Sequence, residues 1–153
     1  MYYLDHKYVL QECCYSEGRG WFGGEIGGMN IRTSANTRIG AIQYADCGGV
    51  HIRVYCQGEY HLSIKGHLFI EYLKGAGSRA VRELCNDGHW FNGSLDLPDA
   101  LDGTTIAAVA YNWGGRTNIR VYYQAEDLSL REHCHDNKGW YPGQSVSSLI
   151  SSF

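Results

Sequence analysis

Residues 131–143 begin with Arg-Glu-His-Cys and end with Trp-Tyr-Pro-Gly, and this pattern occurs three times in the chain. Residues 82–93 begin with Arg-Glu-Leu-Cys and end with Trp-Phe-Asn-Gly. Residues 11–24 begin with Gln-Glu-Cys-Cys and end with Trp-Phe-Gly-Gly. Each copy contains a Glu, a Cys two positions later, a Trp, a second aromatic residue and a Gly. This fivefold agreement in three copies indicates an internal repeat, and the repeat sets the architecture of the chain.

A second repeated segment precedes the last two copies. Residues 52–57 read Ile-Arg-Val-Tyr-Cys-Gln and residues 119–124 read Ile-Arg-Val-Tyr-Tyr-Gln, and an apolar run precedes each. The alternation of apolar and polar residues in these segments is typical of β-strands. A full repeat unit therefore contains four strands, which we expect to begin near Ile39, Ile52, Arg79 and Trp90 in the middle unit and near Thr105, Ile119, Leu128 and Trp140 in the last.

The spacing within the two full units differs by one insertion. Glu132 follows Arg120 by 12 positions, whereas Glu83 follows Arg53 by 30, a difference of 18 residues. The register fits best if the extra residues are about 58–75. These residues could form a surface loop, because loops at the surface of a protein tolerate long insertions. Alternatively, they could be a translated, unspliced intron, because Gly-Glu-Tyr can be encoded across a common splice-donor consensus. Both readings stay open at this point.

Without the insertion the two units repeat every 49 positions, from Arg53 to Arg120. Four short strands in such a unit predict an all-β fold made of β-propeller blades of four antiparallel strands. Aligning Glu12 with Glu132 places Met1 opposite Val121, so the first unit lacks its first strand and its Arg. We therefore expect a partial propeller of about two and a half blades, with an incomplete blade at 1–28, a blade with the insert at 29–97 and a blade at 98–153.

Composition excludes several partners. Thirteen Lys and Arg against 16 Asp and Glu give a net charge of −3, which gives no reason to expect a nucleic-acid partner or an anionic membrane, since either would require a basic face. No apolar run approaches the roughly 20 residues that span a bilayer. The polar residues among the first ten argue against a signal peptide, so we expect a cytoplasmic protein or one released without such a signal.

The cysteines and histidines show no metal or disulfide pattern. Cys14, Cys85 and Cys134 occupy equivalent positions in different units, so they should lie far apart and serve as small core residues. His133 and His135 flank Cys134, so on a strand the two histidines point to the face opposite to that of the cysteine, and one zinc ion cannot use all three. We expect no cofactor and no metal.

These repeated motifs resemble the fungal fucose-specific lectins, most specifically between residues 105 and 143. Members of that family form six-bladed propellers with fucose sites between neighbouring blades, and shorter bacterial relatives oligomerise to complete the ring. The resemblance implies that one blade supplies an Arg and a Glu, and that the next blade supplies aromatic residues and an Ile. It therefore implies an L-fucose or fucosylated-glycan site, without a metal, at Arg53, Glu83, Ile119, His135 and Trp140.

Two further sites are implied in part. Arg120 and Glu132 form a polar half without a following blade, and Tyr15 and Trp21 of a second copy could complete it if chains associate head to tail into a homo-oligomer. Glu12 has no Arg, and the facing blade offers Asn86 in place of an aromatic residue, although Trp90 remains; we expect this third site not to bind.

Other interpretations of the same residues are kept beside this one. The two Arg–Glu pairs could be structural salt bridges, and Trp21, Trp90 and Trp140 could pack blades together. The chain could also be a structural interaction module or a non-binding propeller fragment. A propeller glycosidase is less favoured, because it would need two carboxylates flanking the scissile bond, whereas each site repeats only one Glu.

Overall fold

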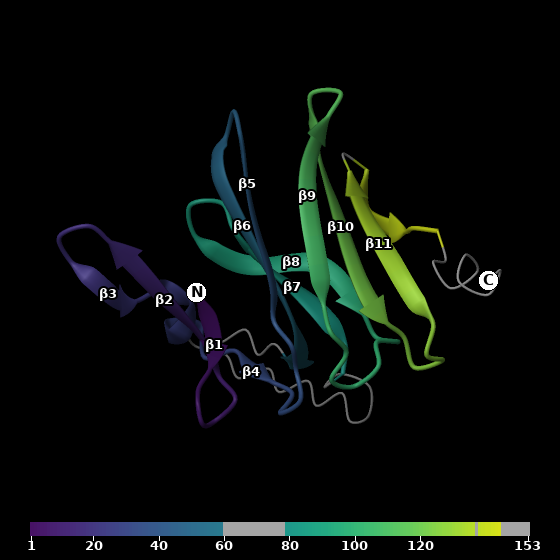
Figure 1. Cartoon of the computed structure of the whole chain (residues 1–153), viewed down its shortest axis with the longest axis horizontal. Coiled ribbons are helices and arrows are strands. Elements are labelled where there is room, and N and C mark those ends of the chain that lie inside the picture. The colour runs from purple at the N-terminus through teal and green to yellow at the C-terminus, as the bar shows by residue number, and fades with distance from the viewer. Residues whose placement is uncertain (60–78, 137, 145–153) are drawn as a thin grey trace, which may run out of the picture.

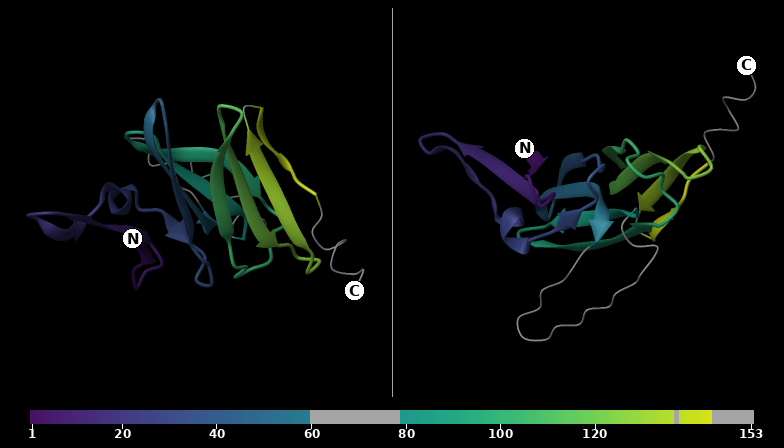
Figure 2. Two further views of the ribbon diagram at one scale, coloured as in Figure 1. Left: turned by 45° about the horizontal axis from the view of Figure 1, so that its top comes forward. Right: turned by 90° about the horizontal axis from the view of Figure 1, so that it is seen from below.

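The computed structural model describes residues 1–59, 79–136 and 138–144, and its regular structure is almost entirely β-strand. Within these ranges twelve strands form three antiparallel sheets. Figure 1 shows the sheets beside one another in chain order, and the turned views of Figure 2 show the same order. Each sheet is one blade of a β-propeller, and together they form a partial propeller, as the repeat predicts.

The last blade has the expected four strands. They are β9 (Ala107–Trp113), β10 (Arg116–Gln124), β11 (Leu130–Asp136) and β12 (Gly139–Pro142), in the spatial order β12-β11-β10-β9. Each strand pairs with its neighbour in sequence. Gly114 and Gly115 adopt positive φ in the turn between β9 and β10, and Gly139 does so at the start of β12. Glycine adopts this backbone conformation without steric cost, which explains its abundance in so short a chain.

The middle blade contains the same four strands and one addition. These strands are β5 (Gly40–Asp46), β6 (Gly49–Glu59), β7 (Val81–Asn86) and β8 (Trp90–Leu97). A short strand that the sequence did not predict, β4 (Arg32–Thr33), pairs with the end of β6. The predicted insert began at about Gly58, but Gly58 lies in β6 opposite Thr33, and residues 60–78 lie outside the described residues.

The first blade has three described strands, β1 (Tyr2–Leu4), β2 (Leu10–Ser16) and β3 (Gly20–Gly23). Tyr2 pairs with Glu12 in the register in which Tyr122 pairs with Glu132, so β1 corresponds to the second strand of a full blade. A 3₁₀ helix, η1 (Glu25–Met29), follows β3 and buries Ile26. The repeat pattern did not predict η1, which with β4 joins the first blade to the middle one.

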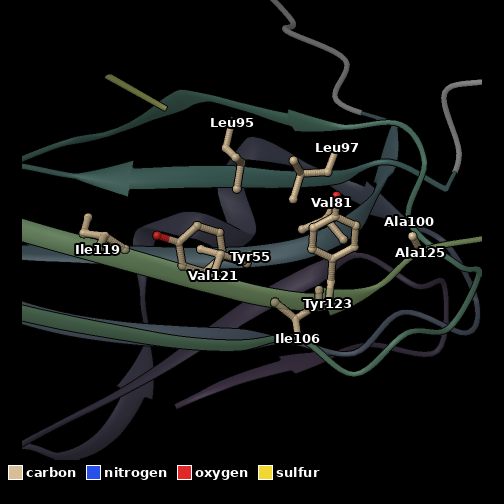
Figure 3. Packing of buried hydrophobic residues seen from close by; sticks show 10 residues of the cluster. All are labelled: Tyr55, Val81, Leu95, Leu97, Ala100, Ile106, Ile119, Val121, Tyr123 and Ala125. Atoms are coloured by element: carbon tan, nitrogen blue, oxygen red, sulfur yellow. The ribbon is translucent and has the colours of Figure 1, made fainter. Parts of the chain in front are cut away.

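Two hydrophobic clusters lie between neighbouring blades. One joins the middle and last blades and is shown in Figure 3; it includes Tyr55, Leu95, Val121 and Tyr123. The other joins the first and middle blades and includes Leu10, Val54 and Leu84. Successive residues of a strand point to opposite faces, so Val54 packs toward the first blade and Tyr55 toward the last. Odd-numbered residues of this part of β6, Arg53 among them, therefore face the last blade.

The buried tyrosines keep their polar ends satisfied. The Tyr55 hydroxyl donates to Glu83 Oε1 at 3.3 Å, and the Tyr123 hydroxyl donates to Asp99 Oδ1 at 3.0 Å. Burying a phenol ring without such an acceptor would leave an unsatisfied donor in the core.

Within the described ranges, no helix combines the length and the hydropathy needed to cross a membrane.

Candidate functional site

Glu83 lies between the middle and last blades and accepts hydrogen bonds from both. It pairs with Tyr55 across β6 and β7, and its side chain is only 5% exposed. Tyr55 donates to Oε1, and Trp140 Nε1 of the last blade donates to Oε2 at 3.3 Å. Arg53 Nε lies 3.8 Å from Oε1. The structure thus brings together three of the predicted site residues, Arg53, Glu83 and Trp140, from two blades.

A glycine on the neighbouring strand makes room for this carboxylate. A Cβ atom on Gly93 would overlap the carboxylate of Glu83. The same relation holds for Gly24 with Glu12 and for Gly143 with Glu132. The repeat pattern pointed to these glycines, but their purpose depends on the distance between two strands, which a single sequence does not state. In each of the three blades, therefore, the absence of a side chain on the glycine leaves room for the carboxylate of the repeated Glu.

Asp87 fixes the orientation of Arg53, and sequence reasoning missed it. Arg53 NH1 and NH2 donate to the two oxygens of Asp87 at 2.7 and 3.2 Å, and NH1 also donates to the Ile52 carbonyl at 2.9 Å. Such two-point pairing is geometrically specific and leaves the Nε edge of the guanidinium toward Glu83. An available signal was that an Asp stands four positions after the Glu in two of the three copies, at Asp87 and Asp136.

His51 extends this arrangement to a second carboxylate. Its Nδ1 lies 2.7 Å from Asp87 Oδ1 and its Nε2 lies 2.8 Å from Asp46 Oδ1. Hydrogen bonds with Asp87 and then with Asp46 raise the pKa of His51, because both favour the protonated ring. Burial alone would raise the pKa of Asp87, but the hydrogen bonds from Arg53 and His51 outweigh it and lower that pKa.

The opposite wall comes from the last blade. Ile119, His135 and Trp140 lie side by side, because Ile119 pairs with His135 across β10 and β11, and His135 pairs with Trp140 across β11 and β12. The Trp140 ring meets His135 edge-on, with centroids 5.1 Å apart, and meets Tyr55 edge-on at 6.4 Å. Trp140 therefore packs between the two blades, in contact with Glu83, Tyr55 and His135.

Between these walls lies a cleft of about 380 Å³, the first cleft. Its lining includes Arg53, Glu83, Asp87, Ile119 and His135, but not Trp140. His135, and not the indole, is therefore the ring that borders the open space. The cleft combines a fixed cation, two carboxylates and an apolar edge.

The second polar half repeats the first with one difference. Arg120 Nε lies 3.8 Å from Glu132 Oε1, Arg120 NH1 donates to the Ile119 carbonyl, and the Tyr122 hydroxyl donates to Glu132 at 2.8 Å. A tyrosine ring lies under each guanidinium, Tyr44 at 5.3 Å from Arg53 and Tyr111 at 5.4 Å from Arg120. Among the described residues, however, no carboxylate clamps Arg120 as Asp87 clamps Arg53, because Asp136 accepts from the Lys138 N–H and the Tyr141 hydroxyl.

Tyr15 and Trp21 are not brought to Arg120 and Glu132 within one chain. They lie on the first blade, at the other end of the row of sheets (Figure 1), and are 63% and 64% exposed. The two rings contact each other edge-on at 5.3 Å. At Glu12 the Tyr2 hydroxyl donates to the carboxylate, and Trp90 packs against Tyr2 at 6.1 Å, but the position of the arginine is absent from the chain.

Of the three repeated cysteines, two are buried as predicted, whereas Cys14 is half-buried. Cys85 and Cys134 are buried, and burial raises their pKa values to about 12 and about 11, so both thiols stay protonated. No group of three potential metal ligands occurs in the described part of the chain.

The fold and the site define a class: β-propeller proteins with polar clefts between adjacent blades. A family model described as fungal fucose-specific lectin matches residues 1–151. The chain belongs to this family. It is 30% identical to the fucose-specific lectin of Aleuria aurantia over 145 residues, and 28% identical to that of Aspergillus fumigatus over a stretch of the same length. These alignments cover 94% and 93% of this chain but only 40% of each relative, so the chain spans less than half their length.

Solved structures agree with this placement. The crystal structure of Aleuria aurantia lectin, described as a six-bladed β-propeller, superposes with a TM-score of 0.72 at 29% identity, covering 95% of this chain and 41% of that one. A fucose lectin from Kordia zhangzhouensis, solved with methyl-fucoside, superposes with a TM-score of 0.66 at 25% identity. In that case the match covers 94% of this chain and 87% of the other, so the two chains are of similar length.

Proposed function

We propose that the first cleft binds L-fucose, free or at the end of a glycan, reversibly and without a metal. The observation that carries this proposal is the convergence of Arg53 and Glu83 on one cleft faced by Ile119 and His135 of the next blade. Relatives solved with fucosides support it, among them Aleuria aurantia lectin in complex with alpha-methyl-L-fucoside, at 28% identity.

The chemistry of the cleft suits a neutral deoxy sugar. Glu83 accepts hydrogen bonds from neighbouring hydroxyls, and the Nε edge of Arg53 donates to a ring oxygen or a hydroxyl. Bonds to such charged groups are roughly twice as strong as bonds between neutral groups. Ile119 offers an apolar surface for a sugar methyl group. Sugars whose hydroxyls point elsewhere would leave these buried polar groups unpaired, which gives selectivity.

The same geometry argues against glycoside hydrolysis. The cleft does hold a second carboxylate, Asp87, beside Glu83. However, Asp87 is paired with Arg53 and His51 and its pKa is lowered, whereas a general acid needs a raised one. The family is a lectin family, and we propose a binding protein without catalysis.

We also propose that copies of the chain associate head to tail. Exposed Tyr15 and Trp21 of one copy would then cover Arg120 and Glu132 of the next, completing a second cleft of the first kind. Val109 and Tyr111, on the edge strand β9 of the last blade, are 45% and 43% exposed, which gives a contacting copy apolar surface to bury. Such a head-to-tail contact closes into a ring when its rotation allows.

The test is a titration of the intact chain with L-fucose, followed by tryptophan fluorescence, with D-galactose as the sugar control. Trp140 donates to Glu83, so a saturable change with fucose alone is the expected result. Arg53→Ala should abolish it, whereas Arg38→Ala, at an exposed position before the start of β5, should not. A folded wild-type chain that responds to neither sugar would overturn the proposal and favour the structural module or the non-binding fragment.

A further inference from the structure

A second cleft of about 510 Å³ adjoins the first. The two share Tyr44, Ile119 and His135 as lining residues, so they are continuous along the junction of the middle and last blades. The second cleft continues toward the turn that joins β5 to β6 and the turn that joins β9 to β10. Figure 1 shows these two turns at the same end of the neighbouring blades.

The lining that belongs to the second cleft alone mixes hydrogen-bond acceptors and donors. Asp46 and Asp136 supply carboxylates, and Arg116 supplies a guanidinium. The Thr117 hydroxyl donates to Asn112 Oδ1 at 3.0 Å, which orients the Asn112 carboxamide and leaves its N–H groups without an acceptor among the described residues. Two acids and one base give a negative balance, which disfavours a phosphate or an acidic sugar.

The two carboxylates are held in place by their own chain. Asp46 Oδ1 accepts from the Gly48 N–H at 2.7 Å and contacts His51, and Asp136 Oδ1 accepts from the Lys138 N–H at 2.8 Å. Each carboxylate retains acceptor capacity beyond these bonds, since an ionised carboxylate has about four lone-pair positions. Fixed acceptors beside oriented donors are what a neutral ligand rich in hydroxyl groups requires, because little ordering remains to be done on binding.

We propose that the second cleft binds the sugar residue to which fucose is linked, so that the two clefts together accommodate a fucosylated disaccharide. This inference rests on the proposed function, because fucose in the first cleft places the next sugar. The shared lining supports this inference, because a ligand of two sugars can extend from one cleft into the other along Tyr44, Ile119 and His135. The second cleft therefore determines the preference among fucose linkages.

The experiment is isothermal titration calorimetry of the intact chain with four probes: α-methyl-L-fucoside and three disaccharides in which fucose is joined α1-2 to galactose, or α1-3 or α1-6 to N-acetylglucosamine. One or two added hydrogen bonds should let at least one disaccharide bind roughly tenfold more tightly than the methyl fucoside. The double variant Asn112→Ala/Arg116→Ala should lose that gain and keep the affinity for the methyl fucoside. Arg38→Ala, outside both clefts, should keep both.

The outcomes separate this inference from the function on which it rests. Equal affinity for all four probes overturns the inference, and so does a gain that survives in the double variant. Either result leaves fucose binding in the first cleft intact. A folded chain that does not bind the methyl fucoside overturns the proposed function and the inference with it.

Discussion

At the scale of single residues, the two arginine sites of this chain differ in one respect. Both guanidiniums donate to the carbonyl of the preceding isoleucine and lie 3.8 Å from a Glu oxygen, but among the described residues only Arg53 is held by an aspartate. In the proposed fucose site, Asp87 would therefore act by orienting Arg53. The last blade therefore provides an internal control, because Asp136 occupies the position equivalent to Asp87 but does not bind the arginine.

Asp87→Ala should weaken fucose binding in the first cleft by roughly two- to tenfold, because Arg53 must then be ordered when the sugar binds. Asp136→Ala is the matched control and should leave this affinity unchanged. Calorimetric titration with α-methyl-L-fucoside measures both. Equal affinities for wild type and Asp87→Ala would show that Asp87 has no positioning role.

The pH dependence of stability should report His51. Its pKa in the folded chain is raised above the ordinary value of 6.5, so the folded chain binds the proton more tightly than the unfolded chain does. The contribution of the charged ring to stability is therefore complete below about pH 6.5 and is lost as the pH rises through the folded-state pKa. Urea unfolding of wild type and His51→Gln should give a difference in unfolding free energy that shrinks with rising pH. A difference that stays constant from about pH 5 to about pH 9 would contradict this.

Gly93→Ala should abolish fucose binding while leaving most of the fold intact. The added methyl group would occupy the space of the Glu83 carboxylate and push it away from Tyr55 and Trp140. Gly23→Ala, on the equivalent strand of the first blade, has open space and is the control. Fluorescence titration measures binding, and circular dichroism checks that the sheet is retained. Unchanged binding in Gly93→Ala would show that the carboxylate position is not critical.

At the scale of elements, the junction of β4 with β6 joins the first blade to the middle one. Gly58 lies against the backbone of Arg32 and Thr33, where a Cβ would come within 2.6 Å of backbone atoms that cannot move aside cheaply. The Leu10 N–H donates to the Ile31 carbonyl and the Thr33 N–H donates to the Tyr8 carbonyl, each at 2.9 Å, so residues 31–33 are bonded to both blades.

Gly58→Ala should therefore destabilise the chain by about 1–3 kcal/mol, because the two backbones must separate. Gly28→Ala, in η1 with nothing nearby, should change stability far less. Chemical denaturation of the two variants measures the difference. Equal stabilities would mean that β4 adapts without cost, and that the blades are joined chiefly by the cluster of Leu10, Val54 and Leu84.

At the scale of the whole molecule, the proposed association would change the number of fucose sites. The described part of a lone chain holds one cleft of the first kind, whereas head-to-tail copies would offer a second at Arg120 and Glu132. Light scattering should show a mass that rises with protein concentration, and the calorimetric stoichiometry should approach two sugars per chain in the associated state. Trp21→Ala should return it to one. One sugar per chain at all concentrations, with a monomer mass, would rule out the proposed association.

The sequence determined the architecture because its signals are local and repeated. Strand alternation, a regular spacing and the recurring Glu, Trp and Gly are visible without distances, so the four-stranded blade and the missing arginine of the first blade follow from them. Family resemblance added the placement of Arg53 and Glu83 in one site and the neighbouring blade that faces this pair.

The tertiary structure alone decided how these residues share the site. Asp87 reaches Arg53 across two strands, Trp140 packs behind Glu83 while His135 borders the cleft, and Gly93 leaves space for a carboxylate ten residues away in the chain. Each of these depends on sheet register and on the docking of one blade against the next. Local periodicity specifies the face on which a side chain lies, but only the packed blades fix the distances between side chains from different strands.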